Sequence, residues 1–365
     1  MGLLPKVAAL AALMFCFDVA QAQAQGPRAI ELSAKAVFKH RHSKVELPPV
    51  LTGLPRTRST EFEADQLDTL SEYATAGLGE VHTVYIYRNV AGGLPIWFDR
   101  ARWMVEHRRG IGTATLHAAG DFVPPGRTNA SGLLATYALS GNSFRSTGLA
   151  LVPVGEWLVK LRSSSQSLSA AELEARMKAA LAEIVWPKKM APAPAAAPVV
   201  PCTTALALSG DAIPVVGDDK SGAAMLFGAL LGQMGATKEP PKQAAVPPQA
   251  RWCRDPTELA EAGVYRADEQ KNGYLLAVGD AGRAITAGPS AGQALIDLDE
   301  QKKAGSERYE VQMVLLSMRA ASRLLDRLPP PAQALAIVKE GRFASSYGTW
   351  GKDKGKITVG PDALK

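Results

Sequence analysis

Cysteine, dense basic runs and long apolar stretches are scarce in this chain, and each scarcity argues against a class of protein. The 365 residues include three cysteines, and no pair has the C-x-x-C spacing typical of a redox centre. Lysine and arginine form no dense run with interleaved aromatic residues, which argues against nucleic-acid recognition. No apolar run reaches the roughly 20 residues that a membrane-spanning helix needs.

What the chain does contain is ordinary globular material. Hydrophobic residues make up 47% of it and charged residues 21%, and its length suffices for two domains. Lysine and arginine total 41 against 35 acidic residues, so the formal net charge is +6. Spread over a chain of this size, that charge favours solubility and attraction to anionic surfaces.

The first 24 residues have the layout of a secretory signal. A basic residue, Lys6, precedes an apolar run over residues 7–17, and small residues follow at alternate positions up to Ala22 and Ala24. This pattern predicts export to the periplasm, with cleavage near Ala22 or Ala24 and no transmembrane segment in the mature chain. The alternative is an N-terminal membrane anchor, for which the apolar run is short.

Removal of the signal would leave two cysteines, Cys202 and Cys253. In an oxidising compartment such a pair favours a disulfide. Closing a loop of about 50 residues would stabilise the fold by roughly 4 kcal/mol in the chain-entropy model. Two buried free thiols and a redox pair are the alternatives.

The clearest structural pattern covers residues 149–187, which we interpret as strand, tight turn, strand and docking helix. In residues 156–162, one face holds Trp157, Val159 and Leu161 and the other Glu156, Leu158, Lys160 and Arg162, as in a strand with one buried face. Ser169 and Glu172 form a capping box at the start of a helix. The apolar stripe of that helix comprises Leu173, Met177, Leu181 and Ile184.

These patterns predict an α+β protein of two domains, each an antiparallel sheet packed with helices. The first domain is expected over residues 27–189, a stiff Pro/Ala-rich linker over 190–201, and the second domain over 202–365 with a Pro-rich loop at 238–249. The expected strands are 82–90, 110–122, 133–139, 147–162, two short ones within 205–216, 264–267, 274–286 as a hairpin, 309–315 and 345–359 as a last hairpin. The expected helices are 94–109, 169–186, 221–236, one from residue 290, and 331–341.

Two motifs match catalytic signatures in part. Residues 288–292 have the G-x-S-x-G pattern of a nucleophile elbow, which also needs a histidine downstream. All five histidines lie upstream of this motif, so a capping box of Ser290 and Gln293 is the better interpretation. Residues 217–222 resemble a phosphate loop, but Asp219 occupies the position that requires glycine before Lys-Ser.

Further candidates are ligand sites. His40, His42 and Glu46 can share one face of an extended segment and form a zinc or copper set, and the alternative is two solvated histidines. Lys160 and Arg162 are expected on the polar face of the central strand. One interpretation is a basic groove that binds an anion, and the alternative is a face exposed to solvent. No cofactor is expected.

The first half of the chain resembles a known fold. VYIYR at residues 84–88, GEWLVKLR at 155–162 and the closing helix with Trp186 are similar to uncharacterised exported bacterial proteins and, more distantly, to the Mog1/PsbP/DcrB-like α+β fold. That resemblance covers about the first domain. It implies an antiparallel sheet backed by helices and an accessory or binding role without catalytic residues.

The expected function is therefore that of a non-catalytic periplasmic binding or accessory protein, with an envelope protein as its partner and no nucleic acid bound. The alternatives are a hydrolase-like enzyme with a site between the domains, and a small-ligand or metal-binding protein that uses His40, His42 and Glu46.

Overall fold

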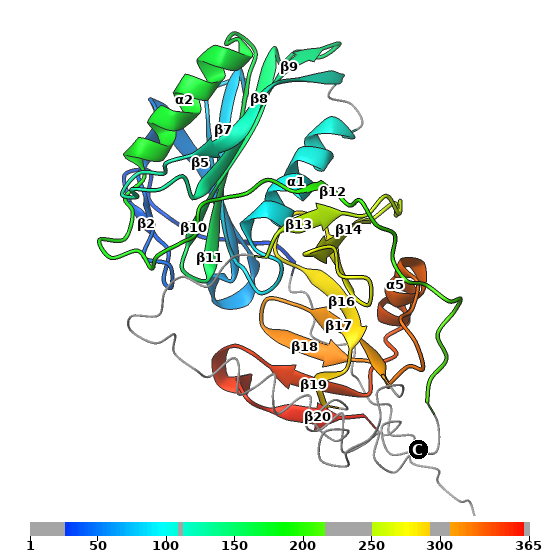
Figure 1. Ribbon diagram of the computed structural model, residues 1–365. Helices are drawn as coiled ribbons and strands as arrows, with labels where there is room; N and C mark the ends of the chain where they lie inside the picture. Colours follow the sequence, from blue (N-terminus) through cyan, green and yellow to red (C-terminus); the bar gives the residue numbers. More distant parts are fainter. Residues whose placement is uncertain (1–25, 109–111, 216–249, 293–306, 361–365) are drawn as a thin grey trace, which may run out of the picture.

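A computed structural model describes residues 26–108, 112–215, 250–292 and 307–360 of the chain. Within these ranges two nine-stranded sheets and three α-helices form the protein, and the chain passes from the first sheet into the second (Figure 1). Neighbouring strands are antiparallel throughout both sheets, except for one parallel pair in the second. The predicted α+β class with antiparallel sheets is confirmed.

The first sheet contains the predicted meander. Its strands follow the order β1-β5-β6-β7-β11-β10-β9-β8, and β4 pairs with β5 beside this path. A separate two-stranded hairpin packs against this half of the protein through its buried residues. The strands are β1 Arg28–Ala29, β4 Val50–Leu51, β5 Leu54–Glu63, β6 Asp68–Ala74, β7 Glu80–Arg88, β8 Thr113–Phe122, β9 Gly132–Ser140, β10 Ser146–Val154 and β11 Trp157–Ser165, and the hairpin is β2 Phe38–Lys39 with β3 Glu46–Leu47; a 3-10 turn, η1, covers Ala64–Gln66.

Helices cover both faces of this sheet (Figure 1). Helix α2, Ala170–Glu183, begins with the predicted capping box of Ser169 and Glu172 and buries the predicted stripe. Its cluster includes Ala150 and Val152 of β10, whereas the alternate residues of the same strand pack with α1, Leu94–Glu106. The expectation that β11 has one buried face is therefore wrong, because α1 and the second sheet cover the other.

Two glycines direct the chain from β7 into α1. Gly92 and Gly93 have φ angles of 74° and 89°, a left-handed conformation that side chains with a Cβ rarely adopt. Pro95 follows in the first helical turn, where a missing backbone N–H leaves no hydrogen bond unmade. The helix that results buries Trp97 and Val105 against the sheet.

The second sheet runs in sequence order from β12 to β20. Helix α5, Pro331–Lys339, packs on β16 and β17, and the predicted hairpins and strands are present. The prediction of two strands within 205–216 is wrong for its described part, which holds one isolated bridge, Pro214 to Leu325. The strands are β12 Val200–Pro201, β13 Trp252–Arg254, β14 Ala262–Ala267, β15 Tyr274–Val278, β16 Ala284–Pro289, β17 Tyr309–Val314, β18 Met318–Ala321, β19 Ser345–Gly348 and β20 Ile357–Val359, with a 3-10 turn, η2, at Gly351–Asp353.

The two sheets share one apolar cluster. Residues of α1 and the first sheet, among them Trp97 and Leu158, pack with Tyr265, Leu275 and Val314 of the second sheet. We call this contact zone the seam. Burial of large apolar side chains on both sides of the seam makes it resemble a domain core.

The Pro/Ala-rich segment 190–201 is extended and hydrogen-bonded along its length. The backbone N–H of Ala196 donates to the carbonyl of Ala130 at 2.8 Å, and the Asn129 amide donates to the carbonyl of Ala193 at 2.8 Å. Val199 packs against the shared apolar cluster. The division into two domains at this segment stays a prediction.

Several expected features lie outside the described residues: the secretory signal, the motif at 217–222, the helix at 221–236, the loop at 238–249, and Gln293 with the helix expected there. Of the helices in the described ranges, none combines the length and the apolar character needed to cross a bilayer.

Candidate functional site

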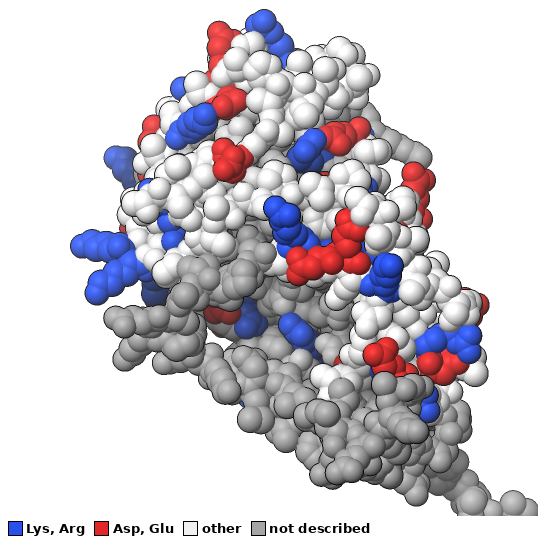
Figure 2. Space-filling view, in the orientation of Figure 1, with Lys and Arg blue, Asp and Glu red and all other residues white. Residues whose placement is uncertain are grey.

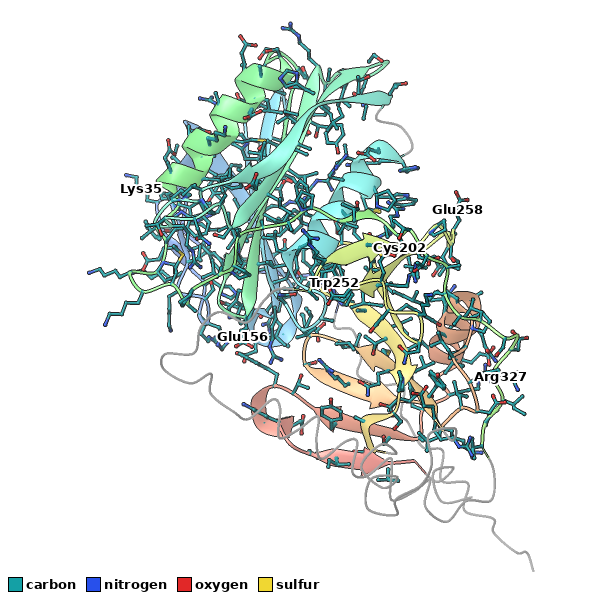
Figure 3. All side chains as sticks on the ribbon, in the orientation of Figure 1. Lys35, Glu156, Cys202, Trp252, Glu258 and Arg327 are labelled. Atoms are coloured by element: carbon teal, nitrogen blue, oxygen red, sulfur yellow. A yellow bond between two sulfur atoms is a disulfide. The ribbon has the colours of Figure 1, made fainter. Side chains whose placement is uncertain are left out.

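A cleft of about 860 Å³ opens where α1 meets the end of the second sheet. One wall is the outward side of α1, a second is β12, and a third is the end of β13 with the chain after it, residues 254–260. In Figure 3, Cys202 and Glu258 mark the last two walls, beside α1. The three walls come from parts of the sequence that are about 50 to 150 residues apart.

Helix spacing forms the first wall. Asp99, Trp103 and His107 follow one another at intervals of four residues, so they lie on one side of α1. The rings of Trp103 and His107 stack with centroids 4.5 Å apart and planes inclined by 13°, and the Arg100 guanidinium lies 4.6 Å from the Trp103 ring centroid. His107 donates from Nδ1 to the carbonyl of Trp103 at 3.0 Å. The aromatic wall is thereby fixed in place.

Asp99 connects this wall to the second sheet. Its carboxylate accepts a hydrogen bond of 2.7 Å from the Tyr265 hydroxyl and one of 3.4 Å from Arg254 Nη1. Burial raises the pKa of Tyr265, so its hydroxyl stays protonated and keeps donating. The positive charge of Arg254 compensates the negative charge of Asp99, and the Tyr265 hydroxyl also holds the carboxylate in place.

A buried ion pair forms the base of the third wall. Arg266 Nε lies 3.2 Å from Asp255 Oδ2, and neither side chain is more than 4% exposed. The other carboxylate oxygen of Asp255 accepts hydrogen bonds from the backbone N–H of Thr257 at 3.1 Å and from its hydroxyl at 2.6 Å. These contacts tie the turn after β13 to strand β14 and give the cleft a rigid rim.

The predicted disulfide between Cys202 and Cys253 is present, with a Cα–Cα distance of 4.8 Å. It joins the residue after β12 to the middle of β13 and so fastens a two-residue strand to the sheet. Cys253 is buried, whereas Val200 and Pro201 beside it are exposed. The disulfide thus fixes the position of the second wall of the cleft.

We expect the Cys202→Ala and Cys253→Ala double substitution to lower the free energy of unfolding by about 2 to 4 kcal/mol, because it releases a closed loop in the unfolded chain. The measurement is urea unfolding of the oxidised protein and of the double variant. Reducing agent should shift the oxidised protein to the variant's stability and leave the variant unchanged. Equal stability of all four samples would contradict a structural disulfide.

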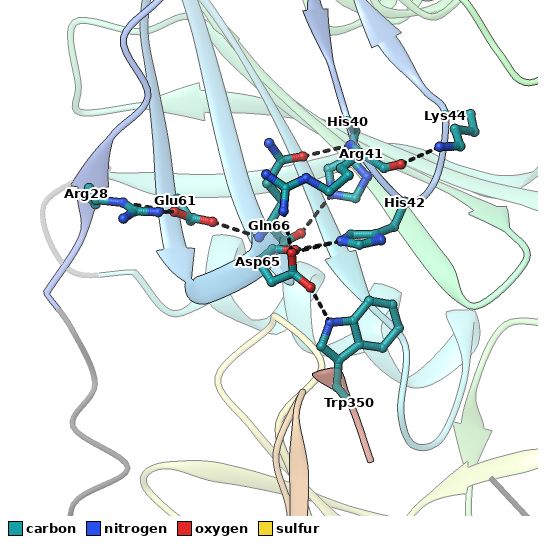
Figure 4. A network of polar contacts seen from close by, with 9 residues as sticks. All are labelled: Arg28, His40, Arg41, His42, Lys44, Glu61, Asp65, Gln66 and Trp350. Atoms are coloured by element: carbon teal, nitrogen blue, oxygen red, sulfur yellow. Dashed lines mark hydrogen bonds and ion pairs between the residues drawn. The ribbon is translucent and has the colours of Figure 1, made fainter. Parts of the chain in front are cut away.

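His40 and His42 lie in the turn between β2 and β3 (Figure 4), and Glu46 belongs to β3. His40 Nε2 donates to the carbonyl of Gln66 at 2.8 Å, and His42 Nε2 lies 3.0 Å from the carbonyl oxygen of Asp65. Glu46 pairs with Lys39 at 3.1 Å. In the described part of the chain no three His, Cys, Asp or Glu side chains are grouped to hold a metal ion.

The turn that the two histidines contact has an unusual backbone. Asp65 and Gln66 have φ angles of 59° and 57°, a conformation that costs energy in residues other than glycine. The carboxylate of Asp65 accepts a 2.7 Å hydrogen bond from Trp350 Nε1, and this bond lowers the pKa of Asp65. His42 stacks on Trp157 with a centroid distance of 5.7 Å. The arrangement holds the first sheet against the η2 turn of the second.

Lys160 occupies neither of the settings expected from the sequence. Its side chain is 1% exposed, and Nζ lies 2.9 Å from Asp280 Oδ2 and 3.0 Å from the Asp280 carbonyl. The rings of Tyr85 and Tyr87 lie 4.6 and 5.5 Å from the ammonium. Burial lowers the pKa of Lys160. Both the solvent face and the open basic groove are wrong for this residue, because the second sheet covers it.

A second set of charges crosses the seam beside Lys160. Arg283 Nη1 lies 3.1 Å from Asp68 Oδ2, and Nη2 lies 3.2 Å from Glu63 Oε2. Arg88 donates to the carbonyl of Leu316 at 2.8 Å. These charged groups join the two sheets.

Ser290 of the G-x-S-x-G motif is buried at the end of β16. Its hydroxyl lies 3.4 Å from Glu310 Oε2, and Gln312 donates to the other carboxylate oxygen at 2.6 Å. Burial raises the pKa of Glu310. In this setting the serine has a structural partner, and its expected partner in a capping box, Gln293, lies outside the described residues.

Sequence reasoning missed the cleft residues Asp99, Trp103 and Arg254. The interval of four residues from Asp99 through Trp103 to His107 is a signal that was available in the sequence, although it does not say what faces it. Surface charge gives no further guide, because basic and acidic side chains are interspersed on the face drawn in Figure 2.

No protein-family model matches the chain, and neither a curated protein nor a solved structure is significantly similar to it.

Proposed function

We propose that this protein is a non-catalytic binding or accessory protein of the cell envelope and that it binds a partner protein at the cleft beside α1. The observation that carries the proposal is a preformed cleft of about 860 Å³ with fixed walls. Stacked aromatic rings form the first wall, a disulfide holds the second, and a buried ion pair holds the third. Preorganisation of this kind reduces the entropic cost of binding.

The chemistry of the lining supports binding rather than bond cleavage. Asp99 already accepts hydrogen bonds from Tyr265 and Arg254, and His107 is stacked on Trp103. A general base or a nucleophile needs an atom that is directed at a substrate and activated by a neighbour. Here the neighbours hold Asp99 and His107 as parts of the walls.

Export to the periplasm, a division into two domains and the resemblance of the first sheet to the Mog1/PsbP/DcrB-like fold are part of the same proposal. The layout of residues 1–24 supports export. A disulfide between Cys202 and Cys253 also suits an oxidising compartment. The Pro/Ala-rich composition of residues 190–201 supports a boundary there.

Site-specific cross-linking in intact cells tests the proposal. A photoreactive amino acid is placed at position 258 on the exposed rim of the cleft and, as a control, at position 174 on α2, where it also replaces a glutamate, one that is 25% exposed. We expect irradiation to attach one envelope protein to position 258 in near-equal amount and not to position 174. Capture of the same proteins at both positions, or of none at 258, would contradict the proposal.

A further inference from the structure

Strand β12 ends the second sheet and leaves one of its edges free. Its inner edge pairs in parallel with β13, with Val200 beside Cys253 and Pro201 beside Arg254. The backbone N–H of Cys202 continues this ladder by donating to the carbonyl of Arg254 at 2.9 Å. The sheet has no strand beyond β12 within the described ranges, so its outer edge is not covered by this sheet.

Polar backbone groups are available on that outer edge. Because successive residues of a strand direct their N–H and C=O groups to opposite edges, Val199 and Pro201 present theirs away from β13. Pro201 contributes a carbonyl and no N–H. In the described part of the chain, neither Val199 nor Pro201 makes a backbone hydrogen bond to another element on this side. Both residues line the cleft, where a further strand has room.

The surroundings of the free edge favour a particular kind of strand. Val200 is 55% exposed, and Leu259 and Trp103 add apolar surface to the same cleft. The charges of Asp99 and Arg254 compensate each other at 3.4 Å. Glu258, which is exposed at the rim, has no hydrogen bond or ion pair to a described residue, so it gives the cleft an excess negative charge.

We infer that the cleft binds an extended segment of the partner protein, which adds to the outer edge of β12 and carries apolar side chains and at least one lysine or arginine. The inference rests on the proposed function and names the partner segment for the same site. Main-chain hydrogen bonds to Val199 and Pro201 supply affinity in such strand addition, and side chains supply specificity. The basic side chain pairs with Glu258, and the apolar ones pack on Val200 and Trp103.

Fluorescence anisotropy with synthetic peptides tests this inference on the purified, oxidised protein. The probe is a labelled eight-residue peptide of alternating valine and lysine. One control peptide replaces lysine by glutamate, and another carries N-methyl groups on alternate backbone nitrogens, which removes donors from one edge. We expect the valine–lysine peptide to bind at least about tenfold more tightly than either control. Non-specific attraction to a protein of net charge +6 would favour the acidic peptide. A preference for the basic peptide therefore has to come from the local charge of the cleft.

Glu258→Lys should reverse the preference between the basic and acidic peptides. The matched control is Asp211→Lys, which makes the same change of charge at an exposed acid that does not line the cleft. It should leave the preference unchanged. Equal binding of the N-methylated and unmodified peptides would overturn strand addition, and equal effects of the two substitutions would overturn the role of Glu258.

Two further outcomes separate this inference from the function on which it rests. Position-specific cross-linking at residue 258 together with failure of the basic peptide to bind would overturn strand addition and leave the proposed function standing. Failure of both would overturn both. Sedimentation velocity tests whether a second copy of this protein occupies the cleft. A dimer that Val200→Lys dissociates would overturn the inference of a different partner protein.

Discussion

Lys160→Met should lower the free energy of unfolding by about 3 kcal/mol, because removal of one member of a buried ion pair leaves the other without its direct partner. Lys160 is 1% exposed, and its only direct carboxylate contact among the described residues is Asp280, at 2.9 Å. Methionine keeps the length and apolar character of the stem, so the change isolates the ammonium group. Urea unfolding at pH 7.5 measures the effect.

A surface pair provides the matched control. Lys178 and Glu174 lie one turn apart on α2 at 2.7 Å, and the lysine is 53% exposed. Lys178→Met should change stability by no more than about 0.5 kcal/mol. The double variant Lys160→Met/Asp280→Asn should recover part of the loss, since the unpaired carboxylate is gone. A loss below about 1 kcal/mol for Lys160→Met would contradict a seam closed around this residue.

Acid should lower the stability of the fold through two buried histidines. The effect should begin at a pH well above the range in which carboxylates usually titrate. Burial lowers the pKa of His40 to about 4 and that of His82 to about 4, whereas the unfolded chain has a histidine pKa of about 6.5. The unfolded state therefore binds more protons between these values. Their contribution to stability is complete above about pH 6.5 and is lost as the pH falls toward 4. For each histidine, the free energy of unfolding should fall by about 2 kcal/mol between pH 7.5 and pH 5.

The hydrogen bonds of the His40 ring require the neutral form. The backbone N–H of Ser43 donates to His40 Nδ1 at 3.1 Å, so this nitrogen must carry no proton. Thr52 donates its hydroxyl proton to the Leu51 carbonyl at 2.8 Å and therefore accepts from His82 Nε2 at 3.0 Å. Protonation of His40 breaks the bond from Ser43 in addition to burying a charge, whereas protonation of His82 keeps the bond to Thr52 and buries a charge.

Stability measured from pH 7.5 to pH 5 tests this prediction. His82→Asn should be less stable at pH 7.5 and should flatten the pH dependence by about 2 kcal/mol over the window, whereas His117→Asn on the exposed strand β8 should leave it unchanged. Asp68 and Glu310 act in the opposite direction, because burial raises the pKa of each and their protonation in the folded state favours folding at low pH. An unaltered slope in His82→Asn would show that this histidine does not contribute.

Local patterns predicted local structure well. The strand, turn and helix of residues 149–187 follow the sequence, because a tight turn, a capping box and a 3.6-residue stripe each act over a few residues. The disulfide was also predictable, since two cysteines remain once the signal is set aside. The same reasoning located the hairpin formed by β15 and β16.

Contacts between distant segments were not predictable in this way. Alternation along β11 separates its two faces but does not say what covers each, so Lys160 was assigned to the surface although the second sheet buries it. The cleft combines α1, β12 and residues 254–260, and no single stretch contains its pattern. His40 and His42 contact a left-handed turn at Asp65 and Gln66, which the sequence gives no reason to expect.

The seam also sets an order in which the protein can be completed during synthesis. Asp65, Asp68 and Arg88 belong to early strands or turns, yet their partners Trp350, Arg283 and Leu316 follow more than 200 residues later. Until those residues leave the ribosome, the apolar face of α1 that the second sheet covers remains exposed. Contacts this distant slow folding and leave partly made chains open to aggregation. The apolar surface of the nascent chain therefore stays uncovered until its last quarter has been made.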